Sequence, residues 1–268
     1  MNYLKSTGKA DAFNSQEFVS LLKTPLTVFS KLLHYKKISS TQDKLKKLAD
    51  KYDREGLVAV ADEQTAGYGR LKRKWSSNFG GLWFSLLLKP RVSPEEVSQA
   101  ALLISIALNK VLQKHYGVKT LIKWPNDILF NDKKLAGILI EMSAEQDKVN
   151  WLVAGIGVNI NNRVSGDFAS NTASVGEIID KSVSRAEFLA LFLKEFDKIY
   201  LKFQLEGFKP FKDYYNKKSA YMGQKLKILS GSDEMFGINL GVDDHGKLIV
   251  KTSQGVEKII SATIRSLK

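Results

Sequence analysis

The stretch from residue 93 to about 116 constrains the fold of this chain more than any other. It opens with SPEE at 93–96, where a hydroxyl precedes a proline and, three residues later, an acid, which is a typical helix start. The sequence that follows, VSQAALLISIALNKVLQ, is apolar on more than one face. Because a surface helix needs one polar face, we predict a helix that runs to about Tyr116 and lies at the centre of the core.

Runs of β-forming residues lie on both sides of this helix. The runs are LVAVA (57–61), LWFSLLL (82–88), TLIKW (120–124), LAGILIEM (135–142) and WLVAGIGVNI (151–160). A second helix start, SRAE at 184–187, predicts a long amphipathic helix to about Phe203. A third, STQD at 40–43, precedes a short helix with one apolar stripe, made by Leu45 and Leu48. This mixture predicts an α/β (α+β) body.

The residue pattern of the sequence changes after Lys218. Short β-forming runs (KLKIL, MFGINLGV, KLIVKT and EKIISATI) are separated by turns that contain Gly, Ser or Asp. Their spacing predicts a small antiparallel barrel appended to the body. The beginning of the chain offers only a possible short helix and a strand. We therefore divide the chain into an N-terminal extension of unknown role at 1–34, a main domain at 35–218 and a C-terminal domain at 219–268.

Composition excludes several kinds of chemistry. The chain has no cysteine, which rules out disulfides, a thiolate nucleophile and Cys-ligated zinc and fits a reducing compartment. Its three histidines lie far apart without metal-binding spacing. No apolar run reaches the roughly 18 to 20 residues of a membrane span, and the N-terminus lacks a secretory pattern. We expect a cytoplasmic protein with no membrane partner.

The net charge of +13 has two interpretations. Lysines are scattered along the whole chain, as they are on an ordinary solvated surface. A basic protein also attracts polyanions and acidic domains and speeds their encounter. Both interpretations stay open.

The segment GYGRLKRKW, residues 67–75, combines two glycines with four cations. Glycines let backbone amides approach phosphate closely. The dinucleotide fingerprint fails, because Lys72 stands where the third glycine belongs, and no Walker A ending follows. A nucleic-acid patch would need a known binding module, and none is visible. From the residues alone, this segment could equally be an exposed, solvated loop.

Two further segments bring chemistry-bearing residues together. KWPNDILF, from Lys123, joins a lysine, an aromatic residue, a proline turn and an Asn-Asp pair. Asn126 and Asp127 could bind a ligand or simply hydrogen-bond their own turn. KKLAGILIE places Lys133 and Lys134 directly before a strand that we expect to be buried, an unusual position for a purely solvated charge.

Taken together, the motifs STQ (40–42), EQTAGYGRLKRKW, GGLWFSLLLKP, KWPNDIL, KKLAGILIE and GIGVNIN resemble those of biotin–protein ligases. Their order and spacing are similar to that family from about Tyr35 to the C-terminus. The resemblance implies a class II synthetase-like catalytic domain, with a mixed sheet and helices packed on one side, and an SH3-like C-terminal barrel. It implies that biotin and MgATP form biotinyl-5′-AMP and pyrophosphate. A lysine of a biotin carboxyl carrier protein or carrier domain then attacks the mixed anhydride.

The resemblance also implies roles for individual residues. Lys134, Lys123 and Arg70 would be catalytic, with Lys134 between the biotin carboxylate and the α-phosphate. The residues implied to bind biotin are Ser40, Thr41, Gln64, Gly67, Lys134, Gly137 and Gly155. Those implied to bind ATP or the adenylate are Arg70, Arg73, Trp75, Lys123, Asn126, Asp127 and Asn159. Asp127 is the one candidate contact for Mg²⁺.

Two departures from the family pattern stand out. The family loop usually reads Gly-Arg-Gly-Arg-x-Gly-Arg, whereas this chain has Tyr68 for the first arginine and Lys72 for the last glycine. A tyrosine cannot neutralise phosphate, so we predict that Tyr68 packs or hydrogen-bonds over the ligand, within a mobile loop that orders over the adenylate. The C-terminal tail, SATIRSLK, differs from the family's usual ending and receives no functional role.

Further expectations concern partners and rivals. About 35 residues precede the catalytic domain, too few for a DNA-binding winged helix of roughly 60, so no DNA binding is expected. The protein is expected to be a monomer or a homodimer. Lipoate ligases and octanoyl transferases share the fold. A basic nucleic-acid-binding protein and a ligase-like binding protein without turnover are the remaining alternatives.

Overall fold

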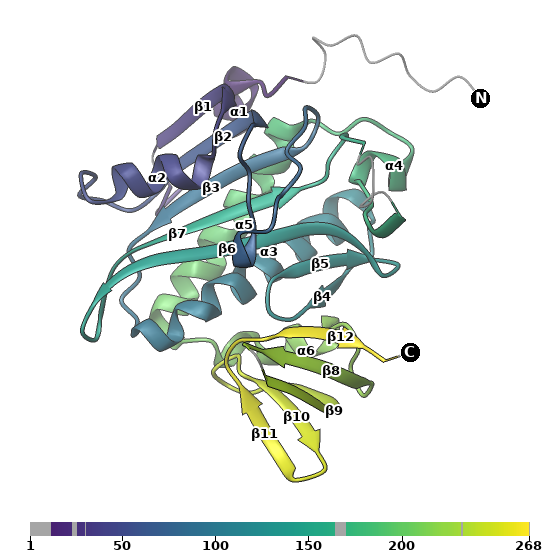
Figure 1. Cartoon of the computed structure of the whole chain (residues 1–268). Helices are drawn as coiled ribbons and strands as arrows, with labels where there is room; N and C mark the ends of the chain where they lie inside the picture. Colours follow the sequence, from purple (N-terminus) through teal and green to yellow (C-terminus); the bar gives the residue numbers. More distant parts are fainter. Residues whose placement is uncertain (1–11, 23–25, 30, 164–169, 232, 268) are drawn as a thin grey trace.

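The computed structural model describes residues 12–22, 26–29, 31–163, 170–231 and 233–267 (Figure 1). Among these residues, seven strands form one mixed sheet and five form a second, antiparallel sheet. The main sheet has the order β1-β2-β3-β7-β6-β5-β4, in which β1 and β2 are parallel and all other neighbours are antiparallel. Its strands are β1 (Lys31–Ile38), β2 (Leu57–Gln64), β3 (Leu82–Leu88), β4 (Leu121–Lys123), β5 (Asp127–Phe130), β6 (Lys133–Glu145) and β7 (Lys148–Val158).

Six α-helices and three short 3-10 turns accompany the strands in the described part of the chain. The α-helices are α1 (Ser15–Leu21), α2 (Thr41–Ala49), α3 (Gln99–Tyr116), α4 (Val175–Ile179), α5 (Arg185–Glu206) and α6 (Lys212–Lys218). The 3-10 turns are η1 (Arg70–Lys72), η2 (Pro94–Ser98) and η4 (Lys209–Phe211). None of the helices that the structure describes is long and apolar enough to cross a membrane.

The prediction of a central apolar helix is confirmed. Ser93 and Glu96 form the expected capping box, although the first turn is the 3-10 turn η2 and α-helical geometry begins at Gln99. The helix ends at Gly117, whose φ of 68° is left-handed and suits glycine. Its side chains are buried between the main sheet and α5, which begins at the predicted cap, Ser184. Figure 1 shows α3 and α5 side by side behind the sheet.

The short helix α2 covers part of the opposite face of the sheet. Its N-cap is Ser40, whose hydroxyl accepts a hydrogen bond from the Asp43 amide, as STQD predicted. Leu45 and Ala49 pack on Leu57 and other residues that point away from α3. The expectation that helices pack on one side only was therefore wrong, because the apolar stripe of α2 needs its own cover from water.

The second sheet lies below the first in Figure 1 and has the order β11-β10-β9-β8-β12. Its strands are β8 (Lys225–Ser230), β9 (Asp233–Val242), β10 (Leu248–Thr252), β11 (Gly255–Ile259) and β12 (Thr263–Ser266). The run EKIISATI, expected to be one strand, is divided between β11 and β12, which lie at opposite edges of the sheet. The short strand β5, inside KWPNDILF, was not among the predicted strands.

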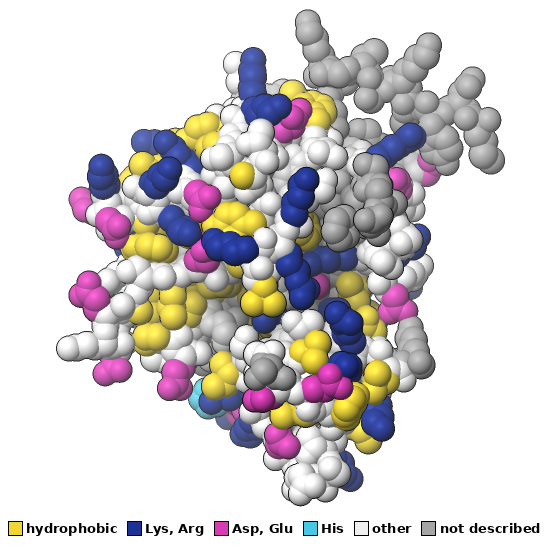
Figure 2. Space-filling model, viewed as in Figure 1, with side chains coloured by type: hydrophobic (Ala, Val, Ile, Leu, Met, Phe, Trp, Pro, Cys, Tyr) yellow, Lys and Arg dark blue, Asp and Glu magenta, His cyan; other side chains and the backbone are white. Residues whose placement is uncertain are grey.

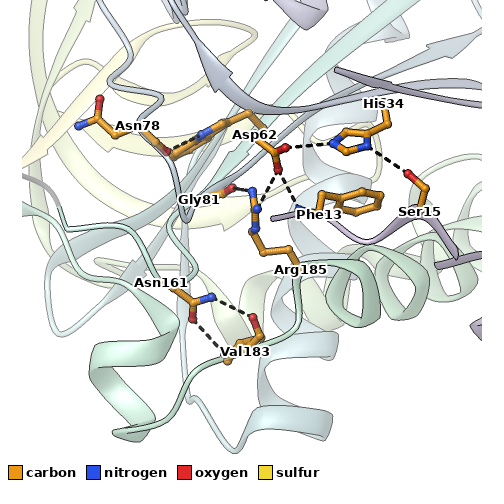
Figure 3. Close-up of polar contacts among 10 residues, drawn as sticks. Phe13, Ser15, His34, Asp62, Asn78, Gly81, Asn161, Val183 and Arg185 are labelled. Carbon is orange, nitrogen blue, oxygen red and sulfur yellow. Dashed lines mark hydrogen bonds and ion pairs between the residues drawn. The ribbon is translucent and has the colours of Figure 1, made fainter. Parts of the chain in front are cut away.

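A buried charge cluster joins the beginning of the chain to the main sheet (Figure 3). Asp62 lies 2.8 Å from Arg185 and accepts a hydrogen bond from the Phe13 amide at 2.9 Å. His34 contacts the other oxygen of Asp62 at 3.2 Å, and Ser15 contacts His34. Phe13 itself is part of the core, so this described part of the segment 1–34 is packed against the body.

The predicted boundaries at residues 34 and 218 stay predictions. The strand β1 runs through residue 34, and α6 ends at Lys218. Residues 1–11, 23–25 and 30 of the predicted extension lie outside the described residues.

Candidate functional site

A cavity of about 600 Å³ lies on the face of the main sheet that α3 and α5 leave open. This volume is in the usual range for small-ligand sites. Every predicted site residue lines the cavity except Gly67. The loop between β2 and β3 and the start of α2 contribute to its wall, and so does the C-terminal sheet. Figure 2 shows Lys and Arg side chains gathered where the body meets that sheet.

At one end of the cavity, the start of α2 meets β2 in a chain of hydrogen bonds. The Thr41 backbone amide and hydroxyl donate to Oε1 of the Gln64 side chain at 2.8 and 3.0 Å. The Gln64 amide nitrogen donates to Ser77 at 2.9 Å, and Thr41 also contacts Ser85 at 2.9 Å. Ser40 is held as the cap of α2. These contacts fix neutral donors and acceptors in a buried wall, as a polar uncharged ring requires.

Glycines on the central strands make room for the side chains that lie over them. A Cβ at Gly155 would stand 2.6 Å from the Gln42 side-chain oxygen, and one at Gly157 would stand 2.5 Å from Trp75 Nε1. Gly137, opposite Gly157 in the register, would bring a Cβ to 3.0 Å from both Trp75 and Lys134. The sheet therefore needs glycine here so that Gln42, Trp75 and Lys134 can lie flat against it.

Gly67 is not among the residues that line the cavity, and its predicted role in biotin binding stays a prediction. A Cβ there would meet the Ser77 hydroxyl at 2.5 Å and the Trp75 carbonyl at 2.9 Å. The residue is enclosed by its own loop. Its backbone carbonyl accepts a hydrogen bond from the Trp75 amide on the other arm of that loop. Its glycine is explained by close backbone approach within the loop.

The opposite end of the cavity is cationic. Lys134 forms an ion pair with Asp127 at 2.7 Å and lies 4.9 Å from the centre of the Trp75 ring. Burial lowers the pKa of Lys123, and nearby Lys134 and Arg265 lower it further, while Asp127 opposes them. Lys123, Lys134 and Arg265 thus lie near one carboxylate, that of Asp127. This end of the cavity has an excess of positive charge, which an anionic ligand would neutralise.

Arg70 joins the loop to the C-terminal sheet. Its guanidinium donates to the Asn126 side chain at 3.3 Å, to the Ala262 carbonyl at 3.2 Å and to the Ser261 hydroxyl at 3.3 Å. Burial lowers the pKa of Arg70, and Arg73 adds to this, against the attraction of Asp127. Asn126 also donates to the Ile138 carbonyl at 2.8 Å, so it is fixed on both sides.

Two more predicted residues lie at the cationic end of the cavity: Arg73 in the loop, and Asn159 directly after β7. Arg73 lines the cavity beside Arg70. Asn159 is buried; its amide lies 3.5 Å from the Lys134 carbonyl, and its side-chain oxygen accepts a bond from Asn162 at 3.0 Å. In the loop, Lys72 has a φ of 55°, a left-handed conformation that favours glycine. This is the position where the resembled family has its last glycine.

Some residues that line the cavity were not predicted from the sequence. Thr263, Ile264 and Arg265 line the cavity from the tail that had been given no role. No local signal marks them, because the contact between Arg70 and Ala262 spans 192 residues of sequence. Gln42 lines the cavity too, and its adjacency to Ser40 and Thr41 in STQ was the available signal.

Three buried polar atoms at the cavity have no hydrogen-bond partner among the described residues. They are the Gln42 side-chain oxygen, Trp75 Nε1 and Asp127 Oδ1, of which the last has its ion pair with Lys134. A buried polar group without a partner is costly, so each atom is suited to a ligand that supplies one.

Magnesium would find one protein ligand here. No group of three His, Cys, Asp or Glu side chains that could hold a metal occurs within the described ranges. Among the described residues that line the cavity, Asp127 is the one carboxylate, and it lies beside Lys134 and near Lys123 and Arg70. This fits Mg²⁺, which commonly takes one or two carboxylates together with substrate phosphates and waters.

The fold and this cavity define a class of enzymes that join a cofactor acid to a protein. Residues 35–159 match the sequence model of the Biotin/lipoate A/B protein ligase family, and residues 221–264 match that of the Biotin protein ligase C terminal domain.

Individual relatives narrow the class. The bifunctional ligase/repressor BirA of Bacillus subtilis is 36% identical over 237 residues, which cover 87% of this chain and 73% of BirA. The biotin–[acetyl-CoA-carboxylase] ligase of Paracoccus denitrificans is 31% identical over 211 residues, 76% of this chain and 88% of that protein. The biotin protein ligase of Aquifex aeolicus, solved with biotin and ATP, has a TM-score of 0.78 and 33% identity, covering 89% of this chain and 100% of that one. The chain belongs to the biotin protein ligase family, whose members are ligases that use biotin, ATP and Mg²⁺.

Proposed function

We propose that this cavity holds biotin at its neutral end and ATP at its cationic end, and that Lys134 acts where the two meet. The observation that carries the proposal is the path of the cavity over the sheet. It passes from Gln42 above Gly155 to Trp75 and Lys134 above Gly157 and Gly137. A ligand that follows this path has a polar, uncharged head and a carboxylate that reaches Lys134.

At the neutral end, the biotin ureido ring would exchange hydrogen bonds with the start of α2 and with Gln64. The side-chain oxygen of Gln42 supplies an acceptor that has no partner among the described residues. A site that hydrogen-bonds such a ring discriminates strongly against acids that lack it, because its buried polar groups would then stay unpaired.

In the first step, a biotin carboxylate oxygen attacks the α-phosphorus of ATP and pyrophosphate leaves. Both reacting groups are anionic, so they repel one another until a cation lies between them. Lys134 is proposed for that place, with Lys123 and Arg70 neutralising the phosphate oxygens. Arg73, Asn126 and Asn159 would help to hold the nucleotide, and Trp75 would pack against the adenylate.

Mg²⁺ would neutralise charge on the phosphates, with Asp127 as its protein ligand. The residues of the chain do the positioning. Asp127 pairs with Lys134 at 2.7 Å, so the arrival of the metal would free the lysine for the biotin carboxylate.

In the second step, the amine of a lysine on a carrier domain attacks the carbonyl carbon of the mixed anhydride, and AMP leaves. This step needs no nucleophile from the ligase, in accord with a chain that has no cysteine. The natural acceptor is proposed to be a biotin carboxyl carrier protein or domain. The excess of positive charge on the chain would speed encounter with an acidic acceptor.

Biotin-dependent exchange of pyrophosphate into ATP tests the first step, with lipoate as the competing acid. We expect exchange with biotin and none with lipoate, and near-complete loss of exchange in Lys134→Ala. The matched control is Lys133→Ala, because Lys133 is exposed and does not line the cavity. Comparable exchange with lipoate, or an active Lys134→Ala variant, would overturn the proposal.

The C-terminal sheet is proposed to be an SH3-like barrel, which its five described antiparallel strands and its match to the C-terminal domain model support. The likeness of the main domain to class II synthetases and the three-part division of the chain rest on the sequence. The cytoplasmic location also rests on the sequence alone.

A further inference from the structure

The loop between β2 and β3 is held together by contacts between its own two arms. Its two arms pair at Gln64 with Ser77 and at Tyr68 with Lys74. The Trp75 amide donates to the Gly67 carbonyl at 2.9 Å. These bonds order the loop internally, but by themselves they leave open how the loop is held against the body.

Tyr68 supplies an anchor between the loop and the body. Its hydroxyl lies 2.7 Å from a carboxylate oxygen of Asp43 and 2.9 Å from one of Glu141. Asp43 belongs to the first turn of α2, and Glu141 belongs to β6. The single hydroxyl proton is shared between the two carboxylates, and Lys46 offsets their charge from 2.9 Å (Glu141) and 3.6 Å (Asp43).

This anchor needs a protonated Tyr68 hydroxyl and an ionised Glu141 carboxylate, and the surroundings of both groups favour these states. Burial, and then the two carboxylates, raise the pKa of Tyr68, so the hydroxyl keeps its proton. Burial would raise the pKa of Glu141 as well, but hydrogen bonds from Lys46, Gln42 and Tyr68 together hold it below its usual value. A protonated donor therefore faces an ionised acceptor at neutral pH, which is the stronger kind of hydrogen bond.

The anchored loop carries two residues of the proposed adenylate site. Arg70 extends from it to Asn126 and to the C-terminal sheet, and Trp75 extends from it over Gly157. The carboxylate at Asp43 lies two residues from Thr41, at the other end of the cavity. The anchor thus ties the nucleotide end of the site to its neutral end.

We propose that Tyr68 is a positioning residue that latches this loop over the cavity. The inference rests on the proposed function, because the latch would serve to retain biotinyl-adenylate until a carrier domain arrives. The reactive anhydride escapes when the loop opens, and a latch that lies outside the reacting atoms slows that opening. Tyr68 contacts two protein carboxylates in this structure, and the predicted contact over the ligand stays a prediction.

Tyr68→Phe removes both hydrogen bonds and keeps the ring. The matched control is Tyr200→Phe, which also removes a tyrosine-to-carboxylate bond, 2.8 Å from Glu55, on α5 and away from the cavity. We expect Tyr68→Phe to speed hydrogen exchange at the Gly69 and Trp75 amides in the ligand-free protein. We also expect adenylate made in a single turnover without carrier to dissociate roughly tenfold faster, the size that loss of a charge-assisted bond gives.

The outcomes separate the latch from the proposed function and from a plain stabilising role. Tyr200→Phe should lower the melting temperature without changing loop exchange or adenylate release. Glu141→Gln, which keeps an acceptor of the same shape, should give the effects of Tyr68→Phe at smaller size. Unchanged exchange at Gly69 and Trp75 in Tyr68→Phe would overturn the latch. If the wild type made no adenylate, the proposed function would fail, and faster exchange in the ligand-free variant would still support the latch.

Discussion

The two faces of the main sheet are made by alternate residues of the same strands, yet they differ in almost every property. On one face, Phe84 and Leu86 of β3 are buried under α3 and α5. On the other, Ser85 lies between them in sequence, and Gly155 and Gly157 of β7 present no side chain. Because side chains alternate along a strand, adjacent residues serve opposite faces. The helix-covered face buries apolar side chains, which stabilises the fold. The open face buries fewer of them and forms the cavity instead.

The residues that stabilise the fold and the residues proposed to bind ligand therefore lie mainly on opposite faces of the sheet. A substitution on the helix-covered face should change the free energy of unfolding and leave ligand binding intact. Filling the space over Gly155 or Gly157 on the open face should mainly weaken ligand binding, whereas Ser40 and Glu141, at its edge, also contribute to stability. If the two faces are independent, a substitution on one of them changes either stability or ligand binding, but not both.

The largest expected effect is on the helix-covered face. Phe192 of α5 is fully buried and stacks on Phe196 with ring centres 5.7 Å apart. Phe192→Ala leaves a cavity there, so we expect the free energy of unfolding to fall by about 3–5 kcal/mol. Denaturant titration measures this. Biotin affinity of the variant below its melting temperature should equal that of the wild type, and a large loss of affinity would show that the faces are coupled.

The next effect is on the open face. Gly157→Ala would place a Cβ against the Trp75 indole, 2.5 Å from Nε1. We expect kcat/KM for adenylate formation to fall about 100-fold, because displacing a ligand-packing ring disturbs the proposed alignment. The control is a double-mutant cycle with Trp75→Ala. If the substitution acts through the indole, the double variant is no slower than Trp75→Ala alone; additive losses would contradict this.

A smaller effect is expected where α2 joins the open face. Ser40→Ala removes the side chain that caps α2 and leaves the Asp43 amide without it. Loss of such a cap costs about 1 kcal/mol of unfolding free energy. Ser40→Asn, which can also cap, should restore stability. A stability equal to that of the wild type in Ser40→Ala would show that α2 is held by packing alone.

The smallest effect is a pH dependence that belongs to the open face. The pKa of Glu141 is held below its ordinary value of 4.5 by hydrogen bonds from Lys46, Gln42 and Tyr68, which outweigh the effect of burial. A lowered pKa contributes stability above pH 4.5 that is lost as the pH falls through the lowered value.

Denaturant titrations from pH 7 to pH 3 measure this contribution. Glu141→Gln should be less stable than the wild type at pH 7, by about 1 kcal/mol or less because the site is partly exposed. The difference should shrink below pH 4.5. The deficit of Phe192→Ala should not change with pH, and a pH-independent deficit in Glu141→Gln would contradict the assignment.

Local signals predicted much of the helix-covered face. The capping residues Ser93 and Ser184 and the apolar pattern after them fix where α3 and α5 begin, since caps act within one turn. The strands β2, β3, β6 and β7 were predicted from their apolar runs, which are also local signals. The short strand β5 escaped, because four residues after a proline turn give too little pattern to separate from a loop.

The open face was predicted less completely. The residues of contiguous motifs, such as Lys123 and Lys134, were brought together as the resemblance implied, although their roles remain predictions. Thr263 to Arg265 reach the cavity only through the packing of the C-terminal sheet, which no local pattern encodes. The partners of Tyr68 lie on α2 and β6, 25 and 73 residues away in sequence, so its anchoring role could not be derived from its own loop.

Calorimetric titration of biotin into Gly155→Val and Ile104→Val tests the central claim, that the open face is the ligand site and the helix-covered face is not. A side chain at 155 would meet the Gln42 oxygen at 2.6 Å, whereas Ile104 is buried on α3. The account predicts at least tenfold weaker biotin binding in Gly155→Val. Ile104→Val should bind as the wild type does and lose about 0.5–1.5 kcal/mol of unfolding free energy. Unchanged biotin affinity in Gly155→Val would contradict the account.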